Sequence, residues 1–383
     1  MLDSPKNMQN VVKNNNLLPQ LSLDDLENMA RGAAFLGTGG GGDPYLGRLI
    51  MQHIFAKYGT PKLINVEALK DDDPVYIAAM MGAPSVMVEK ITGVNEVETA
   101  ISALEQHLGR PAAAIMPAEI GGMNALLPLA IAAKRGIPVI DADGMGRAFP
   151  ELQMVTFAVY GIPTSPFAVA NEHGEYHVIK ARDNKASENA ARQLAIQMGA
   201  SVGLSCYPML GADAKRTAVR GTVSLALGIG RAITEGRTNG DPFVTLQTYL
   251  HSTDYYNQCK LLYSGKIADV SRKVDKGFTV GKCIITGESS AENNLEIIFQ
   301  NEHLRASLNG QTICIVPDLI CILDAESAEP ITTEGLRYGQ RVKVMGVSCA
   351  PIMRRSKALQ TLGPRAFGFD EDFVPIEDLI ESH

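Results

Sequence analysis

A glycine-rich segment near the amino-terminus, Gly37-Thr38-Gly39-Gly40-Gly41-Gly42-Asp43-Pro44, constrains the fold more than any other stretch. Five glycines in six positions remove the Cβ atoms from one turn of backbone, so φ can be positive repeatedly and N–H groups can converge on a ligand. Asp43 and Pro44 are typical of a helix N-cap and first position, which predicts a helix over residues 44–58. We therefore expect Gly39, Gly40, Gly41, Gly42 and Asp43 to bind an anion or a polarised oxygen.

The same segment matches the Gly-x-Gly-x-x-Gly fingerprint of dinucleotide sites, but that fingerprint requires a preceding strand. Residues 22–33 instead begin with a capping Ser22 and carry apolar side chains at helical spacing. A Lys-Ser/Thr pair for a P-loop is missing, and Asp43 places a carboxylate where a phosphate would lie. A nucleotide-dependent enzyme is therefore a secondary hypothesis, and a plain helix–helix connector is another.

Short apolar runs then alternate with helical patterns. Strand candidates and amphipathic helices follow one another, with strands at 62–66, 75–80, 111–116 and 137–140 and helices at 94–107 and 122–135. This alternation predicts a parallel sheet covered by helices. We expect a loosely ordered segment over 1–20, a Rossmann-like α/β domain over 21–165, and a β-rich domain over 166–383 that contains an Asn309-Gly310 hairpin turn.

Carboxylates follow two of the predicted strands. Glu119 comes after the run 111–116, and Asp141 and Asp143 come after 137–140, so we expect all three in one pocket at the carboxyl ends of the strands. Neighbouring carboxylates raise each other's pKa, which suits catalysis by acid or base, and they suit a divalent cation equally well. Arg147 and Glu151 are candidate substrate-binding residues. The alternative is that Asp141 caps the next turn and Arg147 pairs with Glu151.

Composition excludes several classes of protein. The net charge of −7 and the lack of a Lys/Arg cluster argue against a nucleic-acid partner. Apolar runs are too short for a membrane span, and the amino-terminus has no apolar signal core. Six scattered cysteines indicate reduced thiols in the cytoplasm. Cys206 and Cys349, in small-residue segments that we expect to be loops, are candidate nucleophiles, although buried inert thiols are the favoured interpretation.

Four motifs resemble the DUF917 family, which is also named for S-methyl thiohydantoin desulfurase. They are GTGGGGDPYLG at 37–47, DADGMGRAFPELQM at 141–154, PDLI at 317–320 and GPRAFGFDEDFVPIE at 363–377. The resemblance runs from about residue 21 to residue 377 and implies an N-terminal α/β domain with a C-terminal β-rich domain of the swivelling kind. It also implies hydrolytic removal of sulfur from an S-methylated thiohydantoin, a reaction of ergothioneine breakdown.

The resemblance implies a small cyclic substrate, a homo-oligomer and hydantoinase/oxoprolinase subunits as partners, and no cofactor is firmly implied. Many relatives carry a Trp near residues 351–355, whereas this chain has none, so its substrate is open. The main hypothesis is a hydrolase in which Asp143, Asp141 or Glu119 takes a proton from water, the glycine loop holds negative charge, and Arg147 orients the substrate. A metal-bound water is an alternative nucleophile, and a non-catalytic hydantoinase/oxoprolinase subunit is an alternative function.

Overall fold

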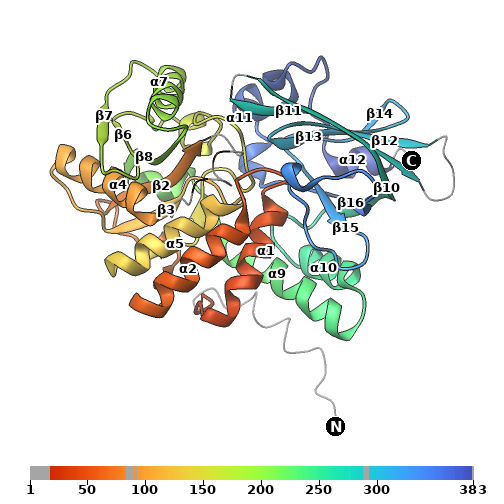
Figure 1. Ribbon diagram of the computed structural model, residues 1–383, viewed down its shortest axis with the longest axis horizontal. Helices are drawn as coiled ribbons and strands as arrows, with labels where there is room; N and C mark the ends of the chain where they lie inside the picture. The colour runs from red at the N-terminus through yellow and green to blue at the C-terminus, as the bar shows by residue number, and fades with distance from the viewer. Residues whose placement is uncertain are drawn as a thin grey trace, which may run out of the picture.

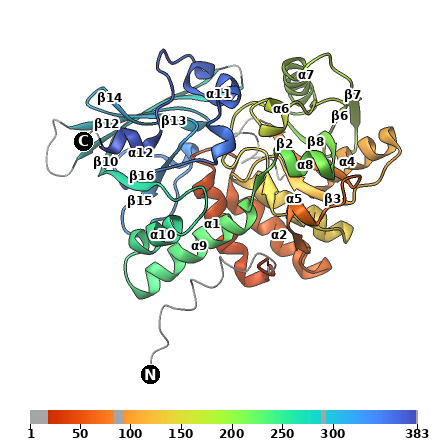
Figure 2. The same cartoon turned by 180° about the vertical axis from the view of Figure 1, so that it is seen from behind.

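The computed structural model describes residues 18–82, 86, 90, 93–275, 277–287 and 293–381. The expectation of a loosely ordered segment over 1–20 lies outside these residues except at 18–20. Two seven-stranded sheets lie side by side, one mixed and flanked by helices, the other antiparallel (Figures 1 and 2). The predicted pairing of an α/β part with a β-rich part is confirmed.

The first sheet has the strand order β1-β4-β3-β2-β8-β6-β7, in which β1, β4, β3 and β2 run parallel and the other three join antiparallel. Its strands are β1 (Leu63–Ile64), β2 (Pro74–Gly82), β3 (Ala114–Pro117), β4 (Val139–Ile140), β6 (Phe167–Ala170), β7 (Tyr176–Ile179) and β8 (Ser201–Leu210). A two-stranded sheet of β5 (Ala142–Asp143) and β9 (Val219–Arg220) follows the end of β4. The carboxyl ends of the parallel strands therefore meet at one edge, as predicted.

Helices cover both sides of this sheet. The helices in this part of the chain are α1 (Leu26–Leu36), α2 (Pro44–Tyr58), α4 (Val94–Leu108), α5 (Met123–Arg135), α6 (Thr156–Val159), α7 (Asn184–Gln197), α8 (Gly211–Thr217), α9 (Thr222–Asn239) and α10 (Pro242–His251). Helix α5 packs on β2 and β3 beside α4, whereas α7 lies on the other side of the strands (Figures 1 and 2). Helix α2 packs on α5, and α1 packs between α2 and α9. The glycine loop between α1 and α2 is thereby fixed at the edge of the sheet.

The helix predicted after the glycine loop is confirmed. Asp43 is its N-cap and accepts a hydrogen bond from the backbone N–H of Tyr45 at 2.8 Å, and Pro44 is its first residue. The element before the loop is helix α1, not a strand, so the structural context of a dinucleotide site is lacking. A helix in place of a strand before the loop removes the main support for a nucleotide-dependent enzyme.

Residues 201–210 were expected to include a loop around Cys206, and this prediction is wrong. They form β8, which lies between β2 and β6 and is buried along most of its length. A strand covered on both faces has no alternation of polar and apolar residues, so its sequence pattern gave no strand signal. The expected domain boundary at 165/166 precedes β6, β7 and β8, which belong to the first sheet.

The second sheet has the order β14-β13-β12-β11-β10-β16-β15 and is antiparallel throughout. Its strands are β10 (Cys259–Asp275), β11 (Phe278–Gly287), β12 (Asn294–Gln300), β13 (Glu302–Leu308), β14 (Gln311–Ile315), β15 (Leu319–Asp324) and β16 (Arg341–Val347). Strands β13 and β14 contact β15, so the sheet curls until its ends meet. Asn309 and Gly310 both have positive φ, which confirms the predicted hairpin turn.

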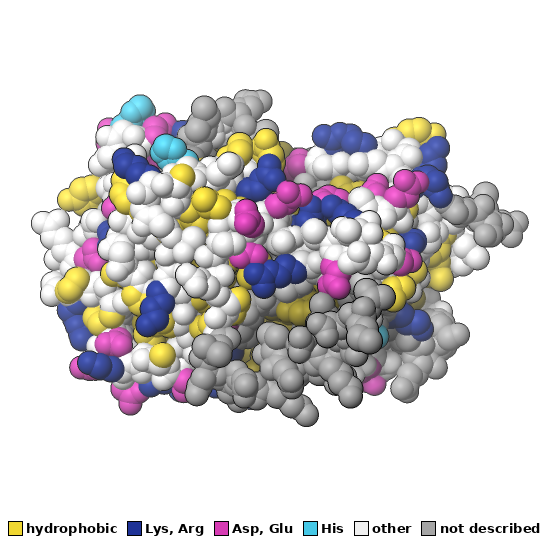
Figure 3. All heavy atoms as spheres, turned by 90° about the horizontal axis from the view of Figure 1, so that it is seen from below, with side chains coloured by type: hydrophobic (Ala, Val, Ile, Leu, Met, Phe, Trp, Pro, Cys, Tyr) yellow, Lys and Arg dark blue, Asp and Glu magenta, His cyan; other side chains and the backbone are white. Residues whose placement is uncertain are grey.

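Two short helices complete this part, α11 (Ser356–Leu362) and α12 (Ile376–Glu381). The interior of the second sheet forms its own apolar core, while a larger core fills the first sheet and the joint between the two. On the face shown in Figure 3, Lys and Arg side chains are scattered between acidic ones. Within the described part of the chain, no helix combines the length and the apolar character needed to cross a membrane.

Candidate active site

Four segments converge where the two sheets meet. The turn after β3 is joined to the glycine loop by a backbone hydrogen bond from Met123 N–H to the Gly41 carbonyl at 2.8 Å, and to helix α1 by one from Gly122 N–H to the Ala33 carbonyl at 2.9 Å. The turn after β3 carries Glu119, and β5 carries Asp143. From the second sheet, the start of β13 adds Glu302 and His303. The site is therefore built from both parts of the chain.

Asp143 is completely buried. Its Oδ2 accepts three backbone hydrogen bonds, from Ile120 at 2.9 Å, Met145 at 3.0 Å and Gly146 at 2.8 Å, whereas Oδ1 has no hydrogen-bond partner. The hydroxyl of Thr222 lies close enough to lower the pKa of Asp143 but falls short of hydrogen-bond geometry. Burial outweighs these contacts and raises the pKa of Asp143 to about 7. This carboxyl therefore titrates near neutral pH, and one of its oxygens has no hydrogen-bond partner.

Glu119 lies beside Asp143 and is also buried. Its Oε1 accepts a hydrogen bond of 2.7 Å from the side-chain amide of Asn124, which is itself held by the backbone of Met80 on β2. Its Oε2 has no hydrogen-bond partner, although the Phe149 N–H is near. Burial first, and the charge of Asp143 in addition, raise the pKa of Glu119 to about 8. Glu119 is therefore mostly protonated at neutral pH.

Glu302 and His303 were missed by sequence reasoning. Only 2% of Glu302 is exposed, its Oε2 has no hydrogen-bond partner, and burial followed by the charge of Glu119 raises its pKa well above the ordinary range. His303 is fully buried; its Nδ1 is 2.8 Å from the Ile320 carbonyl, which assigns the proton to Nδ1 and leaves Nε2 unpartnered. Burial lowers the pKa of His303 to about 4, so the ring is neutral. In the sequence, a Glu-His pair at the start of a strand has the same pattern whether it lies in a buried site or on the surface. No sequence signal therefore marked Glu302 and His303 as site residues.

The glycine loop faces protein rather than open space. A Cβ atom added to Gly40 would lie 1.9 Å from Oε1 of Glu302, and one added to Gly39 would lie 2.7 Å from Nε2 of His303. Gly41 has a φ of +81° and packs against the backbone of Gly121. The loop is glycine-rich because β13 and the turn after β3 approach its backbone. The missing side chains thus make room for these protein neighbours, and the binding of an anion by the N–H groups of the loop stays a prediction.

Two other predicted residues make contacts away from Asp143 and Glu119. Asp141 accepts hydrogen bonds from the backbone N–H (2.9 Å) and hydroxyl (2.6 Å) of Ser224 in the first turn of α9, so it caps that helix instead of facing Asp143. Glu151 pairs with Lys185 near the surface, not with Arg147. Neither arrangement matches the predicted substrate pocket.

Arg147 is fully buried and joins the two sheets. Its N–H groups donate to the carbonyls of Ala148, Pro317, Asp318 and His303 and to the hydroxyl of Thr38, at 2.8–3.1 Å. These five bonds occupy all five donors of a guanidinium group. The predicted role in orienting substrate is therefore corrected to a role in holding the glycine loop against the second sheet.

The two candidate nucleophilic cysteines are buried, and burial raises the pKa of both thiols. Cys206 lies within β8, whereas Cys349 lies in a loop as predicted. Because the thiolate is the nucleophile, neither group is activated. The favoured interpretation of inert buried thiols agrees with this environment.

The site thus collects four buried atoms without hydrogen-bond partners: Asp143 Oδ1, Glu119 Oε2, Glu302 Oε2 and His303 Nε2. Each unpaired buried polar atom costs roughly 1–3 kcal/mol. Such a concentration is typical of a functional site where a reactant or water completes the bonds. Among the described residues, no group of three or more His, Cys, Asp or Glu side chains has an arrangement that could hold a metal ion.

Comparison with known proteins places the chain in a family. Residues 24–181 match the model of the S-Me-THD-like N-terminal domain, and residues 182–376 match that of the S-Me-THD-like C-terminal domain. An X-ray crystal structure of a protein from Chromobacterium violaceum is similar, with 26% identity, a TM-score of 0.79, and coverage of 93% of this chain and 99% of that one. Comparison with curated proteins finds no match. The two domain matches cover nearly the whole chain, which therefore belongs to the S-Me-THD-like family.

Proposed function

We propose that this protein is a hydrolase that removes sulfur, as a thiol, from an S-methyl thiohydantoin or a related five-membered cyclic thioimidate. The observation that carries the proposal is the pair of buried carboxyls, Asp143 and Glu119, each with a pKa near neutrality and one unpartnered oxygen. The family membership supports the substrate class. Six free thiols support a reducing compartment such as the cytoplasm.

The two carboxyls differ in the form that their surroundings favour. Three backbone N–H groups donate to Asp143 and stabilise its ionised form, whereas Glu119 receives one side-chain hydrogen bond and has the higher pKa. Asp143 is therefore the base and Glu119 the proton reservoir beside it. When the surroundings of two neighbouring carboxyls give them different pKa values, one commonly acts as the base and the other as the proton donor.

In the reaction, water attacks the ring carbon that carries the S-methyl group while Asp143 takes one of its protons. That proton passes to the ring nitrogen, so the C=N double bond becomes a C–N single bond in a tetrahedral intermediate. The C–S bond then breaks and the electron pair leaves with sulfur. The hydroxyl oxygen forms the new C=O bond as it gives up its proton, which balances the proton that the departing sulfur takes up. The products are a hydantoin-type ring and methanethiol.

The test is to give the purified full-length protein an S-methyl thiohydantoin and to measure methanethiol and the ring product together. We expect equal amounts of both products, formed at a rate proportional to the enzyme concentration. A parallel reaction with a chelator tests the metal-bound-water alternative, because loss of turnover that added metal restores would assign the nucleophile to a metal. Absence of turnover until a hydantoinase/oxoprolinase subunit is added would favour a non-catalytic subunit instead.

A further inference from the structure

We propose that Glu302, supplied by the second sheet, is the general acid that protonates the departing sulfur, so that the active site is complete only across the joint between the two sheets. This inference rests on the hydrolysis proposed above and adds a catalytic residue to it. The motifs of the sequence, the glycine loop and the carboxylates that follow the strands, did not include Glu302.

The side chain of Glu302 lies close to both the glycine loop and Glu119. Glu302 opens β13, lies against the bare backbone of Gly40, and is close enough to Glu119 for the charge of Glu119 to raise its pKa. Glu119 is in turn affected by Asp143. Glu119 therefore interacts with both of the other carboxyls, which places the base and the acid in one cluster with Glu119.

Glu302 is buried without an ion pair among the described residues, although the backbone N–H groups of Glu302 and Gly41 lie near enough to its carboxyl to lower its pKa. Its Oε2 makes no hydrogen bond, and no ion pair is formed by Glu302 among the described residues. Arg147 is the cation that acts on it electrostatically, but the five N–H groups of Arg147 are bonded elsewhere. A buried acid kept without a salt bridge is neutral and holds a proton to donate.

Hydrogen bonds fix the backbone around Glu302. The His303 N–H donates to the Thr38 carbonyl at 2.8 Å, and the His303 carbonyl accepts from Arg147 at 3.0 Å. The Thr333 N–H also donates to the Gly39 carbonyl, at 2.9 Å. The two bonds of His303 hold the start of β13 against the glycine loop and Arg147, and pre-positioning of this kind is what a general acid requires.

The proton balance closes within the cluster. As the C–S bond breaks, the electron pair moves to sulfur, and sulfur takes the proton of Glu302 to leave as a neutral thiol. The hydroxyl proton of the intermediate then returns through Glu119 to Glu302 as the C=O bond forms. No oxidant, reductant or further reactant is needed.

The test is the dependence of the Glu302→Gln variant on the leaving group. We would compare S-ethyl and S-(2,2,2-trifluoroethyl) thiohydantoins, which differ little in size, because fluorine makes the departing thiolate a weaker base that needs less protonation. Loss of a general acid costs roughly 10²–10⁴-fold in rate. We expect a loss of that size for the S-ethyl substrate and a loss at least tenfold smaller for the trifluoroethyl substrate.

Glu296→Gln, on the neighbouring strand β12, is the matched control, because Glu296 pairs with Lys282 on an exposed part of the same sheet. It should keep wild-type rates with both substrates, and melting curves would verify that both variants fold. An equal loss for both substrates in a folded Glu302→Gln variant, or no loss, would overturn the role of Glu302 while leaving the hydrolysis intact. A wild-type protein that is inactive on both substrates would overturn the proposed function and this inference together.

Discussion

Asp141 and Asp143 are two positions apart, yet their carboxyls do different work because their neighbours differ. The backbone N–H and the hydroxyl of Ser224 donate to the two oxygens of Asp141, which thereby caps α9. Three backbone N–H groups donate to one oxygen of Asp143, and its other oxygen has no hydrogen-bond partner. The sequence predicted that carboxylates would follow β3 and β4. It did not assign the roles, because Ser224 is far along the chain and its approach depends on the packing of α9.

Replacing Asp141 with Ala is expected to weaken the cap of α9 without removing a catalytic group. Loss of an N-cap interaction costs roughly 0.5–2 kcal/mol, so the melting temperature should fall while kcat of the folded protein stays at the wild-type value. Thermal unfolding and steady-state kinetics on the same preparation measure both effects. A large drop in kcat with unchanged stability would return Asp141 to the catalytic set.

Burial of neutral carboxyls makes stability depend on pH. The pKa of Glu119 is raised from 4.5 to about 8 and that of Asp143 from 3.8 to about 7, so the folded protein holds their protons more tightly than the unfolded chain. Their contribution to the free energy of unfolding is complete below about pH 4 and is lost as pH rises through about 7 and 8. Urea unfolding at a series of pH values should show this decline, and Glu119→Gln should flatten it. Identical pH dependence in the variant and the wild type would contradict the assignment.

At the scale of elements, the glycine loop combines a predicted helix start with an unforeseen neighbour. The capping residues of α2 were recognisable because capping is local. The partners of Gly39 and Gly40 come from β13, in the other sheet, and no local pattern specifies them. Likewise β8 was missed because burial on both faces removes the alternation that reveals a strand.

Gly40→Ala tests the close contact between the loop and Glu302. The new Cβ would lie 1.9 Å from Oε1, so either the loop or the carboxyl must move, and overpacking of this kind costs roughly 1–3 kcal/mol. Gly240→Ala is the control, because nothing lies within 4 Å of its added Cβ. We expect Gly40→Ala to lower both stability and turnover, and the double variant with Glu302→Ala to recover stability but not turnover. Additive losses of stability in that double variant would contradict the contact.

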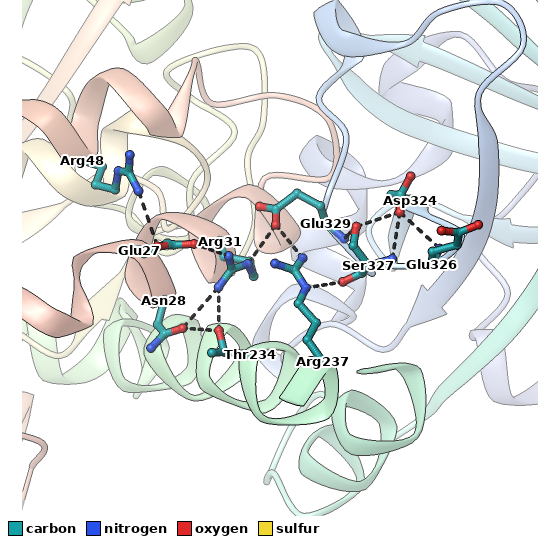
Figure 4. Close-up of polar contacts among 10 residues, drawn as sticks. All are labelled: Glu27, Asn28, Arg31, Arg48, Thr234, Arg237, Asp324, Glu326, Ser327 and Glu329. Carbon is teal, nitrogen blue, oxygen red and sulfur yellow. Dashed lines mark hydrogen bonds and ion pairs between the residues drawn. The ribbon is translucent and has the colours of Figure 1, made fainter. Parts of the chain in front are cut away.

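At the scale of the whole molecule, charged side chains hold the two sheets together. Figure 4 shows Arg31 of α1 and Arg237 of α9 both reaching Glu329, which follows β15, with N–O distances of 3.0 and 2.5 Å. Arg147 makes a second, fully buried joint. The sequence predicted an α/β part and a β-rich part, but a joint made of single long-range contacts leaves no periodic pattern, so neither it nor the site built across it was predictable.

The Arg147→Lys variant should show how much the hydrogen bonds of Arg147 contribute to the free energy of unfolding. Lysine has three donors in place of five, so at least two of the carbonyl and hydroxyl acceptors lose their partner, and each unpaired buried group costs roughly 1–3 kcal/mol. We expect a clear loss of unfolding free energy, measured by denaturant titration. Arg220→Lys, at an exposed pair with Glu67, should change it little. Equal stability of the two variants would contradict the structural role of Arg147.

In the proposed hydrolysis the buried carboxyl cluster does the chemistry with Asp143 as base, and kcat of Asp143→Asn for methanethiol release tests this role most directly. The substitution keeps the shape of the side chain and removes its basic oxygen. Loss of a general base costs roughly 10²–10⁴-fold, so we predict a decrease of that size in a variant whose melting curve shows a folded protein. A folded Asp143→Asn protein with wild-type kcat would contradict the account.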